Sequence, residues 1–231
     1  MDVLPEADQK AAVVRTMFDR IAPSYDRMNR IITLGFDQRW RRSLIDALGV
    51  DGGDTVLDLA CGTGDFALMA RERGARVIGL DFAGAMLTAA RRRCPEPIAL
   101  VRGDALRLPL ADGSVSVAVS GFALRNFVAI PPVLEELARV LRSGGRVGLL
   151  EVDEPRSGLL RLGHGIYFQR IVPAIGALLS DGSAYRYLPA SAAYLPDGEG
   201  LRTMLEEAGF TSIEKRSHLG GAAQSIMAVR A

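Results

Sequence analysis

The chain has 231 residues, of which 48% are hydrophobic and 24% charged, so it can bury the core of one globular domain. Lys and Arg total 28 and Asp and Glu total 27, and the resulting net charge of +1 argues against nucleic acid as a main partner. Cys61 and Cys94 are too few for a disulfide framework and lack the spacing of a zinc site, so we expect no metal ion. No apolar stretch reaches the ~20 residues that span a bilayer, and the sequence predicts a cytoplasmic protein without a signal peptide.

The first elements in chain order are helical, over residues 10–50, with breaks near Pro23 and Gly35. From Thr55 onward, short apolar runs alternate with segments of helical periodicity, which is typical of a parallel sheet covered on both faces. Strands are predicted at 55–59, 76–80, 98–102, 115–120, 146–151, 213–217 and 223–229, and helices at 65–73, 84–94, 131–142 and 200–208.

The last two predicted strands flank a Gly-Gly pair and are expected to form a hairpin that adds an antiparallel strand. The predicted fold class is therefore α/β, a Rossmann-like, doubly wound, mostly parallel seven-stranded sheet with one antiparallel strand and helical lid segments. We expect one domain, 1–231, with a helical cap at 10–50, a core at 51–154 and 200–231, and a lid insertion at 155–199. The cap and the lid are placed over the carboxyl ends of the strands, where open α/β sheets bind ligands.

A glycine-rich turn within VLDLACGTGD, residues 56–65, gives the strongest functional signal. Gly62 and Gly64 let a ligand approach the backbone closely, and the start of the following helix offers free N–H donors. Asp81 follows Gly62 by 19 residues at the end of the second strand, where a carboxylate can bind both hydroxyls of a ribose. Asp104 stands just after the third strand, so the pattern predicts one nucleotide-binding crevice.

Three interpretations of this crevice compete. The acidic residues could simply cap helices or turns, as Asp often does. The glycine spacing also satisfies the dinucleotide fingerprint, but Asp58 puts a negative charge where a pyrophosphate would approach. A Tyr-x-x-x-Lys pair for hydride transfer is missing as well, because the only lysines are Lys10 and Lys215. S-adenosyl-L-methionine, which carries positive charge and no phosphate, is therefore the favoured cofactor.

With these residues in place, the sequence resembles the class I S-adenosylmethionine-dependent methyltransferases, and among them the ubiquinone/menaquinone biosynthesis C-methyltransferases. The resemblance covers essentially the whole chain after about residue 15. Its segments are FDRIAPSYDRMNRIITLGFDQRWRR (18–42), VLDLACGTGDFAL (56–68), GLDFAGAML (79–87), GDALRLPLADGS (103–114), GFALRN (121–126), RVLRSGGRVGLLE (139–151) and AYRYLPASAAYLPD (184–197). The YDxMN, LRN and YRYLP segments are specific to the quinone group.

The resemblance implies contacts with the cofactor at Thr63, with its ribose at Asp81 and with its adenine at Asp104 and Ala105. The family often has a further serine contact just before its FGLRN segment, which is FALRN here; this chain has Gly121 at that place, so only backbone could serve. Together with the residues of the turn, the predicted cofactor site comprises Asp58, Gly62, Thr63, Gly64, Asp81, Phe82, Asp104, Ala105 and Gly121.

The resemblance also implies methyl transfer to a ring carbon of a reduced prenylated quinone, demethylmenaquinol above all. A quinol carbon becomes nucleophilic when its neighbouring hydroxyl loses a proton. The family places this duty near an Arg-Asn pair, here Arg125 and Asn126, with Tyr25 close by. Arginine is a poor base because its pKa lies above about 12, so we expect Arg125 to stabilise the phenolate and Asn126 to orient it. An ion pair and a helix cap are the structural alternative for these two, and His164 is another candidate base.

Departures from the family pattern, Gly121 and the segment LEVDEP (150–155), keep a second acceptor class open, another aromatic or polyketide molecule. The apolar segment 158–179 is interpreted as a packed helix, with a wall for a prenyl tail or a peripheral membrane contact as the alternative. Arg39, Arg41 and Arg42 are expected on a solvated helix face, and residues 91–93 on an exposed helix end. Monomer and homo-oligomer both stay open.

Overall fold

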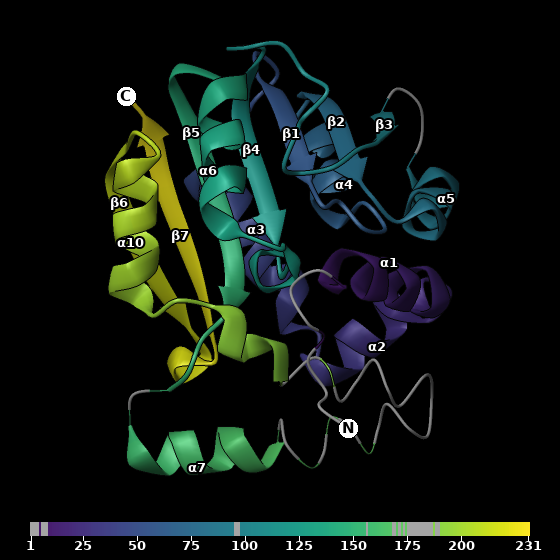
Figure 1. Ribbon diagram of the computed structural model, residues 1–231, viewed down its shortest axis with the longest axis vertical. Helices are drawn as coiled ribbons and strands as arrows, with labels where there is room; N and C mark the ends of the chain where they lie inside the picture. Colours follow the sequence, from purple (N-terminus) through teal and green to yellow (C-terminus); the bar gives the residue numbers. More distant parts are fainter. Residues whose placement is uncertain are drawn as a thin grey trace.

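The computed structural model describes Pro5, residues 9–94, 98–155, 157–167, 170, 172, 174, 187 and 190–231. Its centre is one seven-stranded sheet in the order β3-β2-β1-β4-β5-β7-β6 (Figure 1). The strands are β1 (Thr55–Leu59), β2 (Arg76–Asp81), β3 (Ile98–Arg102), β4 (Val115–Gly121), β5 (Leu141–Val152), β6 (Phe210–His218) and β7 (Ala223–Arg230). Only β7 runs antiparallel to its neighbours, so the predicted fold class and the terminal hairpin are confirmed.

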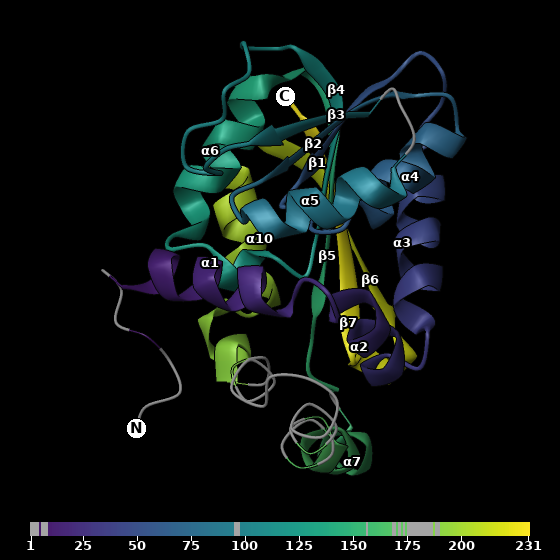
Figure 2. The same ribbon diagram turned by 90° about the vertical axis from the view of Figure 1, so that its right-hand side faces the viewer.

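Helices cover both faces of the sheet: α6 and α10 lie on one side and α3 and α4 on the other (Figure 2). The described helices are α1 (Lys10–Ile21), α2 (Tyr25–Ile32), α3 (Phe36–Ala47), α4 (Asp65–Glu72), α5 (Gly84–Arg93), α6 (Ile130–Val140), α7 (Gly158–Ile166) and α10 (Gly198–Glu207), with short 3-10 turns η1 (Leu124–Asn126), η3 (Ala192–Tyr194) and η4 (Leu219–Gly221). No described helix has both the length and the apolarity needed to cross a bilayer.

The central strands are apolar on both sides because both sides face helices. β4 is buried over six successive residues, and β1 over four. Leu57 and Leu134 belong to the core under α6 and α10, while Val56 and Leu44 belong to the core under α3 and α4. Burying apolar surface on both faces, at about 25 cal/mol per Å², holds the strand ends rigidly enough to carry a site.

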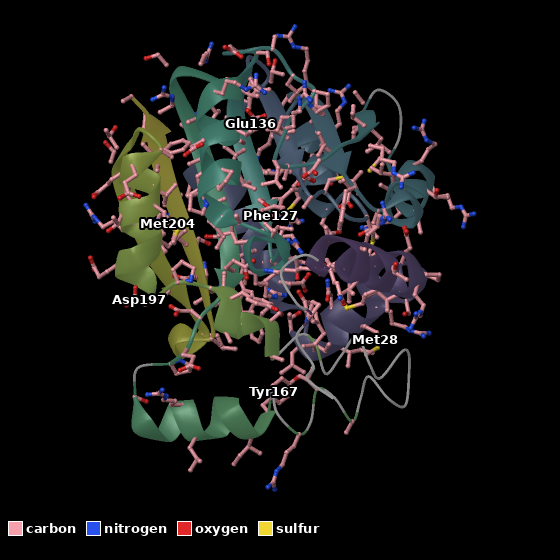
Figure 3. All side chains as sticks on the ribbon, in the orientation of Figure 1. Met28, Phe127, Glu136, Tyr167, Asp197 and Met204 are labelled. Atoms are coloured by element: carbon pink, nitrogen blue, oxygen red, sulfur yellow. The ribbon has the colours of Figure 1, made fainter. Side chains whose placement is uncertain are left out.

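The cap helices α1 and α2 lie beyond the carboxyl ends of the strands (Figures 1 and 2). Lys10 at the start of α1 donates from Nζ to the backbone oxygen of Phe127 at 2.6 Å, and Phe127 lies between the strand ends and α1 (Figure 3). Near the other end of α1, the Asp19 carboxylate accepts a hydrogen bond from Ala85 N, in the first turn of α5, at 2.9 Å. The cap is thus bonded to both sides of the crevice that it covers.

The third helix of the predicted cap lies elsewhere. Trp40, Leu44 and Ile45 of α3 are buried against the sheet and α4, so α3 covers a face of the sheet rather than the strand ends. The reason is its apolar stripe, which repeats at helical spacing and needs a large apolar surface to bury. Much of the predicted lid, including most of 168–189, falls outside the described residues.

Candidate active site

The turn after β1 is held open by backbone that only small residues adopt easily. Gly62 and Gly64 have φ of 55° and 89°, and a Cβ on Gly64 would lie 2.6 Å from the Cys94 sulfur. Gly62 N donates to Asp81 Oδ2 at 2.8 Å, and Ala83 N donates to Oδ1 of the same carboxylate at 2.9 Å. Asp81 therefore fixes the glycine turn to the end of β2.

The resulting crevice is a cavity of about 110 Å³, here called the cofactor cavity. Of the predicted cofactor residues, Gly62, Asp81, Phe82, Asp104, Ala105 and Gly121 line it. Asp81 is 6% exposed, and burial raises the pKa of its carboxyl. Asp104 caps the following turn by accepting from Leu106 N at 2.9 Å. One cavity thus brings together the two carboxylates that the sequence placed at neighbouring strand ends.

The remaining predicted cofactor residues lie deeper. Asp58 is 1% exposed and accepts from Ala67 N in α4 at 2.9 Å, and burial raises the pKa of its carboxyl to about 8. Asp58 and Thr63 line a smaller cavity, here called the inner cavity, which shares Tyr25, Ala60, Gly62 and Gly121 with the cofactor cavity. Gly64 lines neither, and its role is to turn the chain into α4.

Charged side chains tie this turn to the cap. Thr63 Oγ1 bonds to Asp26 of α2, and Arg93 of α5 donates to Thr63 Oγ1 at 2.8 Å. Arg93 also pairs with Asp26 at 2.8 Å and with Asp65 at 2.7 Å. The expectation of an exposed helix end at residues 91–93 is therefore wrong for Arg93. Its partners lie far away in the sequence, so local helix periodicity could not reveal them.

Arg41 is a second correction, because it is 4% exposed and not on a solvated face. Its guanidinium lies 5.1 Å from the Phe66 ring and 5.2 Å from the Phe122 ring. Asp65 lies 3.5 Å from its Nε. Burial acts to raise the pKa of Asp65, but Arg41 and Arg93 outweigh it and the pKa is lowered. Arg39 and Arg42 are exposed, as predicted.

Beyond the cofactor cavity, Arg125 of η1 forms a buried ion pair with Glu151 of β5. The guanidinium donates from Nη1 to Glu151 Oε2 at 2.6 Å, and Leu124 N donates to Oε1 at 2.9 Å. The Glu151 side chain is 2% exposed and that of Arg125 is 6% exposed; burial raises the pKa of the Glu151 carboxyl while Arg125 opposes that shift. Glu151 stands in the LEVDEP segment. The sequence left an ion pair of Arg125 open as the structural alternative but did not identify Glu151 as the partner.

Several polar atoms around this pair are buried without a hydrogen-bond partner among the described residues. They are Arg125 Nε, Asn126 Oδ1 and Tyr187 Oη, of which Asn126 lines the cofactor cavity. Tyr187 comes from the YRYLP segment. The charge of Arg125 acts to lower its pKa, but burial dominates and raises the pKa to about 12. Such atoms are costly to bury unless a ligand bonds them.

The second large cavity, about 360 Å³ in volume and here called the acceptor cavity, is mostly apolar. Tyr25 and Phe122 line both large cavities, and Arg125 lines the acceptor cavity beside them. Burial raises the pKa of Tyr25. The wall continues to Tyr167 at the end of α7 (Figure 3), whose hydroxyl donates to the backbone oxygen of Ile32 at 2.8 Å. The three predicted catalytic residues thus lie where the two cavities meet; the side chain of His164 is outside the described residues.

Sequence comparison identifies the family of the chain. The profile of the ubiE/COQ5 methyltransferase family matches residues 6–230. The chain belongs to this family. A demethylmenaquinone methyltransferase from Roseiflexus sp. is 44% identical over 218 residues, which are 93% of this chain and 92% of the relative. One from Thermus thermophilus is also 44% identical, over 84% of this chain and 91% of its own.

A further family member, a ubiquinone/menaquinone biosynthesis C-methyltransferase from Syntrophotalea carbinolica, is 39% identical over 90% of both chains. Solved structures of similar fold include a SAM-dependent methyltransferase from Thermotoga maritima, with a TM-score of 0.68 and 19% identity over 94% of this chain and all of that one. Another, from Aquifex aeolicus, has a TM-score of 0.61 and 15% identity over 83% and 89% of the two chains. This ubiE/COQ5 family protein is therefore an S-adenosylmethionine-dependent methyltransferase.

The walls of the cofactor cavity fit that cofactor. Among the described residues that line it, none is basic, so a pyrophosphate would meet Asp81 and Asp104 without a compensating cation. The apolar side chains of Phe82, Met86 and Phe127 suit a flat base. When bound, S-adenosylmethionine supplies a methyl group on a positively charged sulfur. No group of described His, Cys, Asp and Glu residues is placed to hold a metal ion.

Proposed function

We propose that this protein transfers the methyl group of S-adenosylmethionine to a ring carbon of a reduced prenylated quinone, demethylmenaquinol in particular. The observation that carries the proposal is the junction of the two large cavities at Tyr25 and Phe122. The cofactor cavity, whose wall carries Asp81 and Asp104, there meets an apolar chamber of about 360 Å³, and Arg125 is the one cation among the described residues that line this chamber. The family relatives with the same activity in their names support this choice of acceptor.

The chain's own residues would position the acceptor and manage its proton. A quinol carbon attacks only when its ortho hydroxyl gives up a proton, here to water, and a buried guanidinium stabilises the phenolate that forms. Arg125 has one Nε–H to offer, because its Nη1 is held by Glu151. Asn126 Oδ1 can accept from the other hydroxyl of the ring. Since burial raises the pKa values of Tyr25 and Tyr187, both act as donors at neutral pH and not as bases.

On the cofactor side we assign Asp81 to the ribose hydroxyls and Asp104, Ala105 and Phe82 to the adenine. The two oxygens of Asp81 accept from Gly62 N and Ala83 N, and a carboxylate that lines the cavity can accept further hydrogen bonds from a ligand. Gly62 and Gly121 contribute backbone at the wall, and Gly64 shapes the turn. Binding this cofactor next to an apolar chamber excludes water and aligns carbon, methyl and sulfur, which is the main requirement of methyl transfer.

The test is incubation of the purified protein with methyl-labelled S-adenosylmethionine and lipid extract from cells that lack their quinone methyltransferase, with and without dithionite. Label in the quinone fraction only under reduction is expected. Label that also appears without dithionite would refute the quinol mechanism. No label in quinone, despite measurable cofactor binding, would overturn the acceptor and favour a soluble aromatic or polyketide substrate.

We further propose that the mouth of the acceptor cavity rests on the membrane in which a prenylated quinol dissolves. Leu34 and Leu219 line this cavity and are 74% and 58% exposed, and Leu162 of α7 is 63% exposed. A neighbouring groove contains Arg39, Arg42 and Arg216, which suits anionic headgroups. Apolar side chains at a cavity mouth, next to clustered cations, favour a peripheral contact.

Co-sedimentation with vesicles containing phosphatidylglycerol tests the membrane contact. Leu34→Asp and Leu219→Asp are each expected to lower partitioning roughly ten- to a hundredfold, since a buried leucine contributes about 1.5–3 kcal/mol. Val13→Asp is the matched control, because Val13 is 44% exposed on α1 and lines neither large cavity. Equal losses for all three variants would refute this docking face.

A further inference from the structure

Arg41 is a buried cation whose hydrogen-bonding capacity is not used by its neighbours. It stands on α3, is 4% exposed, and its guanidinium lies near the rings of Phe66 and Phe122. Its Nε has no hydrogen-bond partner among the described residues. Arginine side chains are almost never buried in this way unless a carboxylate or a ligand bonds them.

The two nearest carboxylates balance its charge without taking its N–H groups. Asp65 and Asp37 lie 3.5 and 3.9 Å from Nε, and both bond other donors. Gln38 donates to each of them at 2.9 Å, Thr33 donates to Asp37, and Arg93 donates to Asp65. The guanidinium is thus neutralised in charge but keeps its donors for another acceptor.

The guanidinium faces the inner cavity, where this chain lacks a side chain. A Cβ built on Gly121 would lie 2.5 Å from Arg41 Nη1 and 2.8 Å from Phe66. Any residue larger than glycine at 121 would therefore push the arginine away.

The amino-acid end of the cofactor has the charges that this cavity complements. It is a zwitterion with one carboxylate and one ammonium, and the inner cavity is lined by the cation Arg41 and by two acidic residues, Asp58 and Asp65, of which Asp65 has a lowered pKa. A guanidinium binds a carboxylate through two parallel hydrogen bonds, the strongest geometry for such a pair. The inner cavity shares four lining residues with the cofactor cavity, so a nucleoside bound at Asp81 directs its amino-acid end toward Arg41.

We propose that Arg41 binds the carboxylate of the methionyl group of S-adenosylmethionine and that Gly121 provides the space for it. The proposal rests on the cofactor and on no property of the acceptor, so it stands or falls independently of quinol methylation. Arg41 is then a binding residue of the cofactor site that reaches it from a helix on the face of the sheet.

The test compares S-adenosylmethionine with decarboxylated S-adenosylmethionine, which lacks only the carboxylate, by titration calorimetry. The unaltered protein is expected to prefer the carboxylated ligand roughly 10- to 100-fold, the range for a hydrogen-bonded charge. Arg41→Met keeps the apolar stem between the two rings and should abolish the preference while leaving the affinity for the decarboxylated ligand unchanged. Arg41→Lys should retain part of the preference.

Asp81→Ala is the matched control, because it should weaken both ligands equally and preserve their ratio. If Arg41→Met does not fold, Gly121→Ala provides the same test, since its methyl group displaces the guanidinium. An unaltered protein that binds both ligands equally would overturn the proposal. So would an Arg41→Met or a Gly121→Ala variant that keeps the full preference.

Discussion

The two large cavities differ in how their polar groups are satisfied. On the cofactor side, the buried carboxylates of Asp58 and Asp81 already accept backbone hydrogen bonds from Ala67, Gly62 and Ala83. Where this cavity meets the acceptor cavity, Arg125 and Asn126 each keep a buried polar atom without a partner among the described residues. The two carboxylates on the cofactor side are therefore held by the chain itself, although Arg41 of the inner cavity is not, whereas the polar atoms at the junction are left to be completed by a polar ring.

This difference separates two kinds of role. Residues of the cofactor side should control affinity for S-adenosylmethionine, because the walls are formed before the ligand arrives. Residues of the acceptor side should control turnover, since their unsatisfied groups gain most when charge develops on the substrate. Substitutions on the two sides should therefore be separable by measurement.

The largest effect is a loss of stability, expected when the buried ion pair of Arg125 and Glu151 is broken. Glu151→Gln leaves the guanidinium of Arg125 opposite a neutral amide and should lower the free energy of unfolding by about 3–5 kcal/mol. Urea denaturation followed by the fluorescence of Trp40, the single tryptophan, measures this. Glu154→Gln is the control, because Glu154 and Arg161 are 71% and 68% exposed and the loss there should stay below about 1 kcal/mol. Equal losses of unfolding free energy in the two variants would contradict the prediction that the buried pair of Arg125 and Glu151 stabilises the fold more than an exposed pair.

Arg125→Met should lower kcat roughly 100- to 1000-fold, the cost of removing one group that stabilises a developing oxyanion. The cofactor dissociation constant should stay unchanged, because Arg125 lines the acceptor cavity and not the cofactor cavity. Glu151, whose pKa burial raises, can take up a proton when the arginine is gone. Single-turnover kinetics and calorimetry on the same preparation separate the two quantities. A parallel loss of cofactor affinity would remove Arg125 from its catalytic role.

On the cofactor side we expect the opposite result, a loss of cofactor affinity. Asp81→Ala should weaken cofactor binding by about 1.5–3 kcal/mol, or roughly ten- to a hundredfold, because a charged acceptor of the ribose hydroxyls is lost. Calorimetry with S-adenosylhomocysteine measures it. Asp112→Ala is the control, because Asp112 is 80% exposed and pairs with Arg139 away from both large cavities. An unchanged dissociation constant for Asp81→Ala would refute the ribose assignment.

The two sides also differ in how far the sequence could predict them. The strand, glycine turn and helix around Gly62 are contiguous, and Asp81 and Asp104 follow at the next strand ends, so local patterns placed them in one crevice. The mostly parallel seven-stranded sheet and the terminal hairpin were predicted for the same reason. Glu151 and Arg125 come from different elements, and their pairing depends on the register of β4 and β5. Helix periodicity likewise predicted, wrongly, that Arg41 faces solvent. The reason is that its partners Asp65 and Phe66 belong to another helix.

The last effect is a pH dependence that Asp58 contributes to stability. Burial raises the pKa of Asp58 to about 8, whereas an unfolded aspartate has a pKa of about 3.9. Between these values the native state binds more protons than the unfolded state, so Asp58 stabilises the fold at low pH. That stability is lost by at most about 1.4 kcal/mol per pH unit as pH rises toward 8. Asp58→Asn still accepts a hydrogen bond from Ala67 N but does not titrate, so its free energy of unfolding should change less between pH 5 and 8. Parallel pH profiles for the variant and the unaltered protein would place the titrating group outside the inner cavity.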